Sequence, residues 1–88
     1  MKFMIVRTWE PHESVEIAKR RLEKGRMVPE GVKVIGEWLA TAGGRQFALI
    51  DADSDVACWN WCLRWNDLGK NESVNVVEVK DDKATQIA

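Results

Sequence analysis

Arg7 is the residue of this sequence best placed to bind an anion. It follows Phe3 and Ile5 at alternate positions of an apolar segment, which predicts a guanidinium on the buried face of a strand. A buried guanidinium needs a carboxylate partner or an anionic ligand. Asp51 and Glu78 are expected on neighbouring strands and could supply an ion pair. An Arg7 that binds a substrate carboxylate is the functional alternative.

The sequence has one histidine, His12, which directly follows Pro11 at the expected start of a helix. The helix dipole disfavours the imidazolium there, so a neutral base would be available for acid–base catalysis. A surface position in the turn after Pro11 is the alternative. No serine stands in the sequence context of a nucleophile elbow, so a hydrolytic triad has no support.

Cys58 and Cys62 are one helical turn apart, a spacing that could place two thiolates on one metal ion. Further ligands would have to come from elsewhere, and His12 offers the only imidazole. Both cysteines fall on the apolar stripe of an expected helix. We therefore predict two small buried thiols and no metal site.

Five of the seven aromatic residues are tryptophans. Trp61 and Trp65 share the stripe of the two cysteines and are predicted to pack in the core. Trp59 points to the opposite side of the same helix, where it would meet the first helix, a partner subunit or a ligand. Trp9 and Trp38 end or interrupt strands, and each could belong to the core, to a dimer contact or to a pocket wall.

Composition and charge exclude several classes of protein. The chain of 88 residues suits one domain, and its net charge of −1 gives no global field for nucleic acid. The basic run Lys19–Arg21 has acidic neighbours and no interleaved aromatic residues, so a solvated helix face explains it. Apolar runs of a few residues are too short to span a membrane, and the start lacks a signal-peptide cleavage site. We expect a cytoplasmic protein.

Periodicity and turn residues predict the elements that hold these side chains. Strands are expected over Lys2–Trp9, Val32–Ala40, Arg45–Asp51 and Glu72–Lys80. One helix is expected from His12 or Glu13 to Lys24, with Val15, Ala18 and Leu22 facing the core. A second helix is expected from a cap at Ser54 or Asp53 to about Leu68. Residues 1–80 then form one domain, and 81–88 form a mobile tail.

The order β-α-β-β-α-β predicts an α+β fold, the ferredoxin-like sandwich with one antiparallel four-stranded sheet and both helices on one face. The strands carry apolar residues on both sides: Phe3, Ile5 and Trp9 oppose Met4 and Val6, and Phe47 and Leu49 oppose Ala48 and Ile50. Two helices cover only one face, and monomers rarely expose an apolar patch larger than a few hundred Å2 (about 300–600). A second copy is the simplest cover, so we predict a homodimer through the sheet face.

Four segments resemble a widespread family of small proteins known only as a domain of unknown function. They are residues 25–31 (GRMVPEG), residues 36–38 (GEW), Phe47-x-Leu49 leading into Asp51-Ala52-Asp53, and Trp61-x-x-x-Trp65-Asn66-Asp67-Leu68 before a valine-rich strand. The resemblance covers nearly the whole chain and implies the dimeric α+β barrel fold, but no activity.

More distantly, the architecture is similar to antibiotic-biosynthesis-type monooxygenases, haem-degrading monooxygenases and small lactone isomerases. Those proteins bind ligands between the sheet and its helices. The haem-degrading group typically has a histidine on the second helix and an asparagine on the first strand. This sequence has neither residue at those places, so we expect no haem and no other cofactor.

Together these observations predict a small dimer that binds an apolar or aromatic small molecule, acidic ones included, in a Trp-rich pocket. The predicted ligand-binding residues are Arg7, Trp9, Arg26, Trp38 and Trp59. His12 would be the acid or base if the protein catalyses a cofactor-independent oxygenation or isomerisation, and whether it is an enzyme stays open. A non-catalytic structural or protein-interaction dimer is the alternative.

Overall fold

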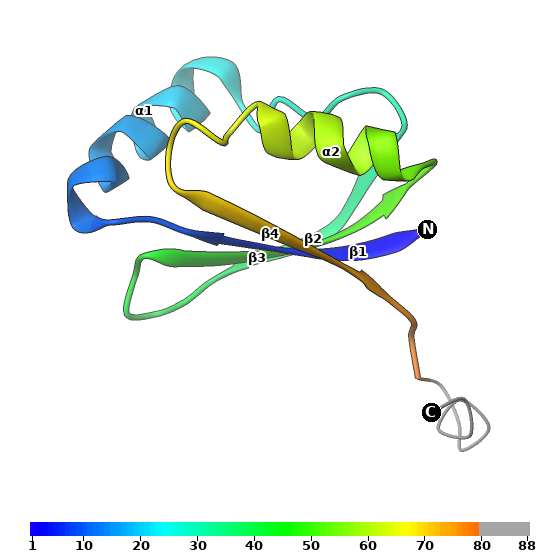
Figure 1. The fold of residues 1–88 in the computed structure, drawn as a ribbon. Coiled ribbons are helices and arrows are strands. Elements are labelled where there is room, and N and C mark those ends of the chain that lie inside the picture. Colours follow the sequence, from blue (N-terminus) through cyan, green and yellow to red (C-terminus); the bar gives the residue numbers. More distant parts are fainter. Residues whose placement is uncertain (80–88) are drawn as a thin grey trace.

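The computed structural model describes residues 1–79; Lys80 and the predicted tail over 81–88 lie outside the described residues. The elements follow in the order β1 (Lys2–Thr8), a short 3-10 helix η1 (Pro11–Glu13), α1 (Ser14–Lys24), β2 (Val32–Leu39), β3 (Arg45–Ala52), α2 (Asp55–Leu63) and β4 (Lys70–Val76). The strands form one antiparallel sheet in the order β2-β3-β1-β4, and both helices lie on one face (Figure 1). The predicted ferredoxin-like α+β topology is confirmed. No helix within residues 1–79 is long and apolar enough to cross a membrane.

Strand β4 begins and ends earlier than the predicted range Glu72–Lys80. It ends at Val76 because Val76 pairs with Lys2, the first residue of β1, and the ladder has no further partner there. It begins early because Gly69, with a φ of +91°, turns the chain closely onto β1. A Cβ at Gly69 would lie 2.5 Å from the carbonyl oxygen of Thr8, so only glycine allows this approach.

Helix α2 starts as predicted and ends at Leu63 rather than at Leu68. The hydroxyl of Ser54 caps it by accepting a hydrogen bond from a backbone N–H three residues later. After Leu63, the N–H groups of Arg64 and Trp65 donate to carbonyls three residues back, so the chain tightens into turns. These turns still place Trp65 in the core.

The hydrophobic core lies between α2 and the sheet face that the helices cover. Its buried members are Phe3, Ile5, Ala48, Ile50, Ala52, Ala57, Cys58, Trp61, Cys62 and Trp65. Trp61 is fully buried and Trp65 is 4% exposed. The predicted core-facing stripe of α2 is therefore confirmed.

Helix α1 contributes no buried residue. Val15 and Leu22, which were predicted to face the core, are 72% and 89% exposed, so that prediction is wrong. The helix stands over the end of the sheet where the β2–β3 hairpin turns (Figure 1). The sheet presents Glu37 and Gln46 there, and α1 turns Arg21 toward Glu37.

The second face of the sheet carries no helix within residues 1–79 (Figure 1). Strict alternation of burial in β1 and β3 places Met4, Val6, Phe47 and Leu49 on this face. Val74 of β4 pairs opposite Met4 and is 54% exposed. The apolar second face predicted from the sequence is present.

Candidate functional site

Arg7 lies in the middle of the sheet with polar neighbours on both sides. It pairs in register with Gln46 of β3 and with Asn71 of β4. Its Nε donates to Oδ1 of Asn71 at 3.1 Å, and its Nη1 donates to Oε1 of Gln46 at 3.5 Å. Arg7 is 8% exposed, and its buried Nη2 has no hydrogen-bond partner among residues 1–79.

The predicted ion pair between Arg7 and Asp51 or Glu78 is wrong. Asp51 binds the N-terminal amine at 3.1 Å, and a Glu78 oxygen lies 3.6 Å from Nζ of Lys2. The register explains this, because Asp51 pairs with Lys2 at the opposite end of β1 from Arg7. The neighbours of Arg7 in the sheet are amides, not carboxylates.

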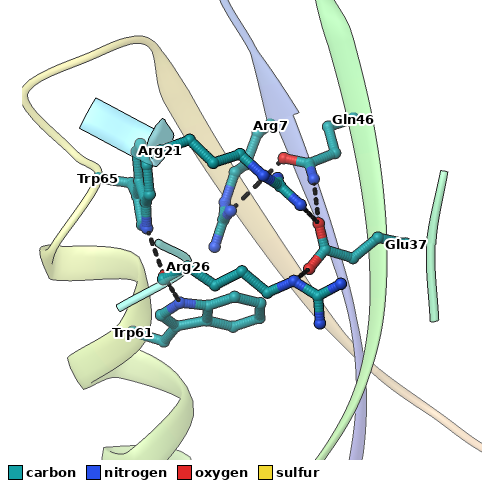
Figure 2. A network of polar contacts seen from close by, with 7 residues as sticks. All are labelled: Arg7, Arg21, Arg26, Glu37, Gln46, Trp61 and Trp65. Atoms are coloured by element: carbon teal, nitrogen blue, oxygen red, sulfur yellow. Dashed lines mark hydrogen bonds and ion pairs between the residues drawn. The ribbon is translucent and has the colours of Figure 1, made fainter. Parts of the chain in front are cut away.

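Two tryptophan rings flank the Arg7 guanidinium (Figure 2). Its carbon Cζ lies 4.4 Å from the ring centre of Trp61 and 5.5 Å from that of Trp65. Ring faces attract a cation but accept no strong hydrogen bond, so they leave Nη2 unsatisfied. Burial lowers the pKa of Arg7, and the buried Cys62 and the Glu37 carboxylate act in the opposite direction. A positive charge is thus held inside the protein without a directly bonded carboxylate.

Glu37 of β2 joins three side chains around this charge (Figure 2). Its Oε2 accepts from Nη2 of Arg21 at 3.0 Å and from the amide of Gln46, and its Oε1 lies 2.9 Å from Nε of Arg26. The Glu37 side chain is 8% exposed, whereas those of Arg21 and Arg26 are 41% and 51% exposed. The two ends of the Gln46 amide therefore link Glu37 to Arg7.

The loop before β2 is held in place by α2 and the turns that follow it. The indole N–H groups of Trp61 and Trp65 both donate to the carbonyl oxygen of Arg26, at 2.8 and 3.1 Å. Arg64 donates to the carbonyl of Met27 at 2.8 Å. Met27 has a φ of +53°, an uncommon value for a residue with a side chain, and these hydrogen bonds stabilise it. The rings that flank Arg7 therefore also position Arg26.

An open cavity of about 630 Å3 lies beside this cluster, between α1 and the β2–β3 hairpin. Its polar lining residues include Ser14, Arg21, Arg26, Glu37 and Gln46, and its larger apolar lining residues are Trp9, Ile17, Trp38 and Leu39. A recess of about 20 Å3 contains Arg7 and shares Trp9, Ile17, Arg21 and Gln46 with the cavity. We call the two together the α1 cavity. Its volume is within the range of about 300–1,000 Å3 that is usual for small-molecule sites.

The structure brings four of the predicted binding residues together, since Arg7, Trp9, Arg26 and Trp38 line the α1 cavity. The ring of Trp38 lies against Gly36, and because Gly36 and Trp38 pair with Leu49 and Phe47, this ring lies on the open face of the sheet, away from Arg7. Trp59 is 60% exposed and lines a separate groove of about 350 Å3 between α2 and β4.

His12 does not join this group, because it is exposed on η1 and does not line the α1 cavity. Its catalytic role stays a prediction.

Sequence reasoning missed Glu37, Arg21 and Gln46. Arg21 belongs to the basic run that was interpreted as a solvated helix face, and both Arg20 and Arg21, although partly exposed, form ion pairs with other elements. Arg20 forms a bidentate ion pair with Asp67, with N···O distances of 2.7 and 2.6 Å, and Arg21 forms an ion pair with Glu37.

Glu37 was missed because β2 contains a bulge between Val34 and Gly36. Simple alternation from Val34 would point Glu37 away from the helices. The bulge reverses the alternation, so Glu37 pairs with the buried Ala48 and faces Arg21. Gly36 was the one available signal, because a glycine inside a strand often marks a bulge.

The two cysteines are free and buried, as predicted. Burial raises the pKa of both thiols, and it raises the pKa of Cys62 to about 11. In the part of the chain that the structure describes, no three His, Cys, Asp or Glu side chains are grouped to hold a metal ion.

A comparison with protein families returns one that matches residues 1–86, described as "Domain of unknown function (DUF3303)". The chain belongs to this family. The DUF3303 match covers all the segments on which the resemblance was based, and the ferredoxin-like fold that the resemblance implied agrees with the observed sheet and helices. No curated protein gave a significant match to the chain. The DUF3303 description carries no activity, so the function must be argued from the α1 cavity.

Proposed function

We propose that this DUF3303 domain binds a small molecule with an apolar or aromatic body and an acidic group. The observation that carries the proposal is Nη2 of Arg7, a buried donor without a partner among residues 1–79, on a side chain that lines a small recess beside an open cavity. A buried cation without a bonded carboxylate is costly unless something supplies the opposite charge. An acidic oxygen of a ligand in the recess would accept the free hydrogen bond of Nη2.

The rest of the α1 cavity suits the body of such a ligand. Trp9, Ile17 and Leu39 offer apolar and aromatic surface, and α1 leaves the cavity open to solvent. Pockets of this kind bind a ligand through their apolar walls, and a few polar groups fix the orientation of that ligand. Arg7 would be the main orienting group.

The protein is further proposed to be a homodimer that pairs its open sheet faces. Met4, Val6, Phe47 and Leu49 give that face an apolar centre. A second copy brings the same surface, so a two-fold pairing would cover both faces at once. The α1 cavity lies on the opposite face of the sheet and would stay accessible. The cytoplasmic location stays a prediction from the sequence.

Catalysis by His12, as a cofactor-independent oxygenation or isomerisation, would need the reacting group of the ligand to extend out of the α1 cavity to η1. We therefore place binding first and leave chemistry as a second step to be tested with an identified ligand.

Titration of tryptophan fluorescence with benzoate, phenylacetate, hexanoate and decanoate tests the binding proposal, because Trp61 and Trp65 flank Arg7. At least one of these acids is expected to bind with one site per chain. Arg7→Lys keeps a charge but removes the free Nη2, and it should weaken binding about tenfold or more. Arg45→Lys, at an exposed position outside the α1 cavity, is the matched control and should bind normally. No binding by any of the acids, or equal binding by Arg7→Lys, would contradict the proposal.

One observation favours the alternative, a non-catalytic dimer or protein-interaction module. Val56, Trp59 and Leu63 form an apolar stripe on the outer side of α2 and are 64%, 60% and 48% exposed. Such a stripe is typical of a surface that binds another protein. A dimer that binds none of the four acids, and whose Trp59→Ser variant loses a protein contact, would favour this alternative.

A further inference from the structure

We propose that the ligand of the α1 cavity is a monoanion, and that Glu37 excludes dianions. This inference rests on the proposed function, because it concerns which acids the same site accepts. It starts from the charges around the cavity. Arg7, Arg21 and Arg26 carry three positive charges, and Glu37 carries one negative charge.

The three arginines are not equivalent. Arg21 and Arg26 are about half exposed, and both contact Glu37, at 3.0 and 2.9 Å. Water and Glu37 together satisfy these two groups. Arg7 is 8% exposed and has no carboxylate contact within residues 1–79, so it alone needs a negative charge from a ligand.

Glu37 occupies the place that a second acidic group would need. A ligand held at Arg7 and reaching toward Arg21 and Arg26 would meet the Glu37 carboxylate bound to both. Two carboxylates on the same donors repel, and the repulsion is strong near a side chain that is 8% exposed. Glu37 cannot easily move away, because the amide of Gln46 also holds it.

Removing this charge should therefore change selectivity more than it changes affinity for simple acids. Glu37→Gln keeps a side chain of the same size and an oxygen acceptor. It frees the charges of Arg21 and Arg26 for a second acidic group of the ligand. The affinity for a dicarboxylate should then increase, while the affinity for a monocarboxylate bound at Arg7 should change little.

The experiment measures dissociation constants for two matched pairs, hexanoate with adipate and benzoate with phthalate, by tryptophan fluorescence. Wild-type protein should prefer the monocarboxylate of a pair by about tenfold or more, and Glu37→Gln should reduce this preference at least about tenfold. Glu30→Gln removes the same charge from an exposed loop position and should leave the preference unchanged. If Glu37→Gln does not fold, Arg21→Gln gives an independent result. Arg21→Gln removes a positive charge that neutralises Glu37, so it should increase the preference for the monocarboxylate.

The outcomes separate the two proposals. If no acid of either pair binds wild-type protein, the proposed function fails. If the monocarboxylates bind but wild-type protein binds the dicarboxylates equally well, the role of Glu37 fails and the proposed function stands. The role of Glu37 also fails if Glu37→Gln keeps the wild-type preference, or, where Arg21→Gln is used, if that variant keeps it.

Discussion

Arg7 and Trp61 are in face contact, with the guanidinium carbon 4.4 Å from the ring centre. Trp61 also donates from Nε1 to the carbonyl of Arg26, at 2.8 Å. One fully buried ring therefore contacts the unsatisfied cation and anchors the loop that carries a second arginine of the cavity. Core packing and the candidate binding site share this residue. Its effects on stability and on binding must therefore be separated by substitutions at neighbouring residues.

Arg7→Met should cost little stability. The substitution removes a desolvated charge that has no carboxylate partner among the described residues, although it leaves Asn71 and Gln46 without a donor. We expect the free energy of unfolding in urea to change by no more than about 1 kcal/mol, against about 3–5 kcal/mol for breaking a buried ion pair. A loss in the larger range would show that Arg7 is a structural residue.

Trp61→Phe should destabilise the fold much more than Trp59→Phe. Trp61 is fully buried and hydrogen-bonded to Arg26, whereas Trp59 is 60% exposed. We expect losses of about 2–4 kcal/mol and less than about 0.5 kcal/mol, respectively, in urea denaturation followed by circular dichroism. Equal losses would contradict the burial described for α2.

Trp59→Phe should also leave the binding of monocarboxylates unchanged. Trp59 lines the groove between α2 and β4, and none of the residues that line the α1 cavity is on α2. Titration of this variant therefore identifies the site that is used. Loss of binding would move the site to the groove beside Trp59.

Leu49→Lys should dissociate the proposed homodimer. Leu49 lies on the open sheet face, where a buried lysine without a partner would be costly in a dimer. Native mass spectrometry should show dimers for wild-type protein and monomers for the variant. Leu22→Lys, at an α1 position that is 89% exposed, is the matched control and should stay dimeric. Monomeric wild-type protein would overturn the dimer.

The buried thiols should make stability fall at alkaline pH. Burial raises the pKa of Cys62 from an ordinary 9.0 to about 11. Between these values the unfolded chain has lost the thiol proton and the folded chain keeps it, so the free energy of unfolding decreases as pH rises. Cys62→Ala should show a smaller decrease between pH 9 and pH 11 than wild-type protein in urea denaturation. An equal decrease would show that the Cys62 thiol is not protected.

Most of the fold could be predicted from the sequence because its signals are local. Alternation in β1 and β3 and the serine cap of α2 all depend on neighbouring residues. The core position of Trp61 and Trp65 could also be predicted, since large apolar rings at helical spacing usually pack in a core.

The candidate site was predicted only in part, because it depends on register and on one bulge. Arg7 was identified, but its neighbours Gln46 and Asn71 follow from the pairing of three strands. The bulge before Gly36 turns Glu37 inward against simple alternation. The apolar stripe of Val15 and Leu22 predicted a core-facing α1, and it failed because polar groups of the sheet attract Arg21 instead.

The most direct test of the central claim is an NMR titration of the arginine side-chain N–H signals. Hexanoate and benzoate are added to 15N-labelled protein, and the Arg7 signals are assigned by their loss in Arg7→Lys. We predict that at least one acid shifts the Arg7 signals saturably, while the signal of the exposed Arg45 stays in place. Arg7 signals that do not move with either acid, or that move only together with those of Arg45, would contradict the assignment of Arg7 as the anion-binding group.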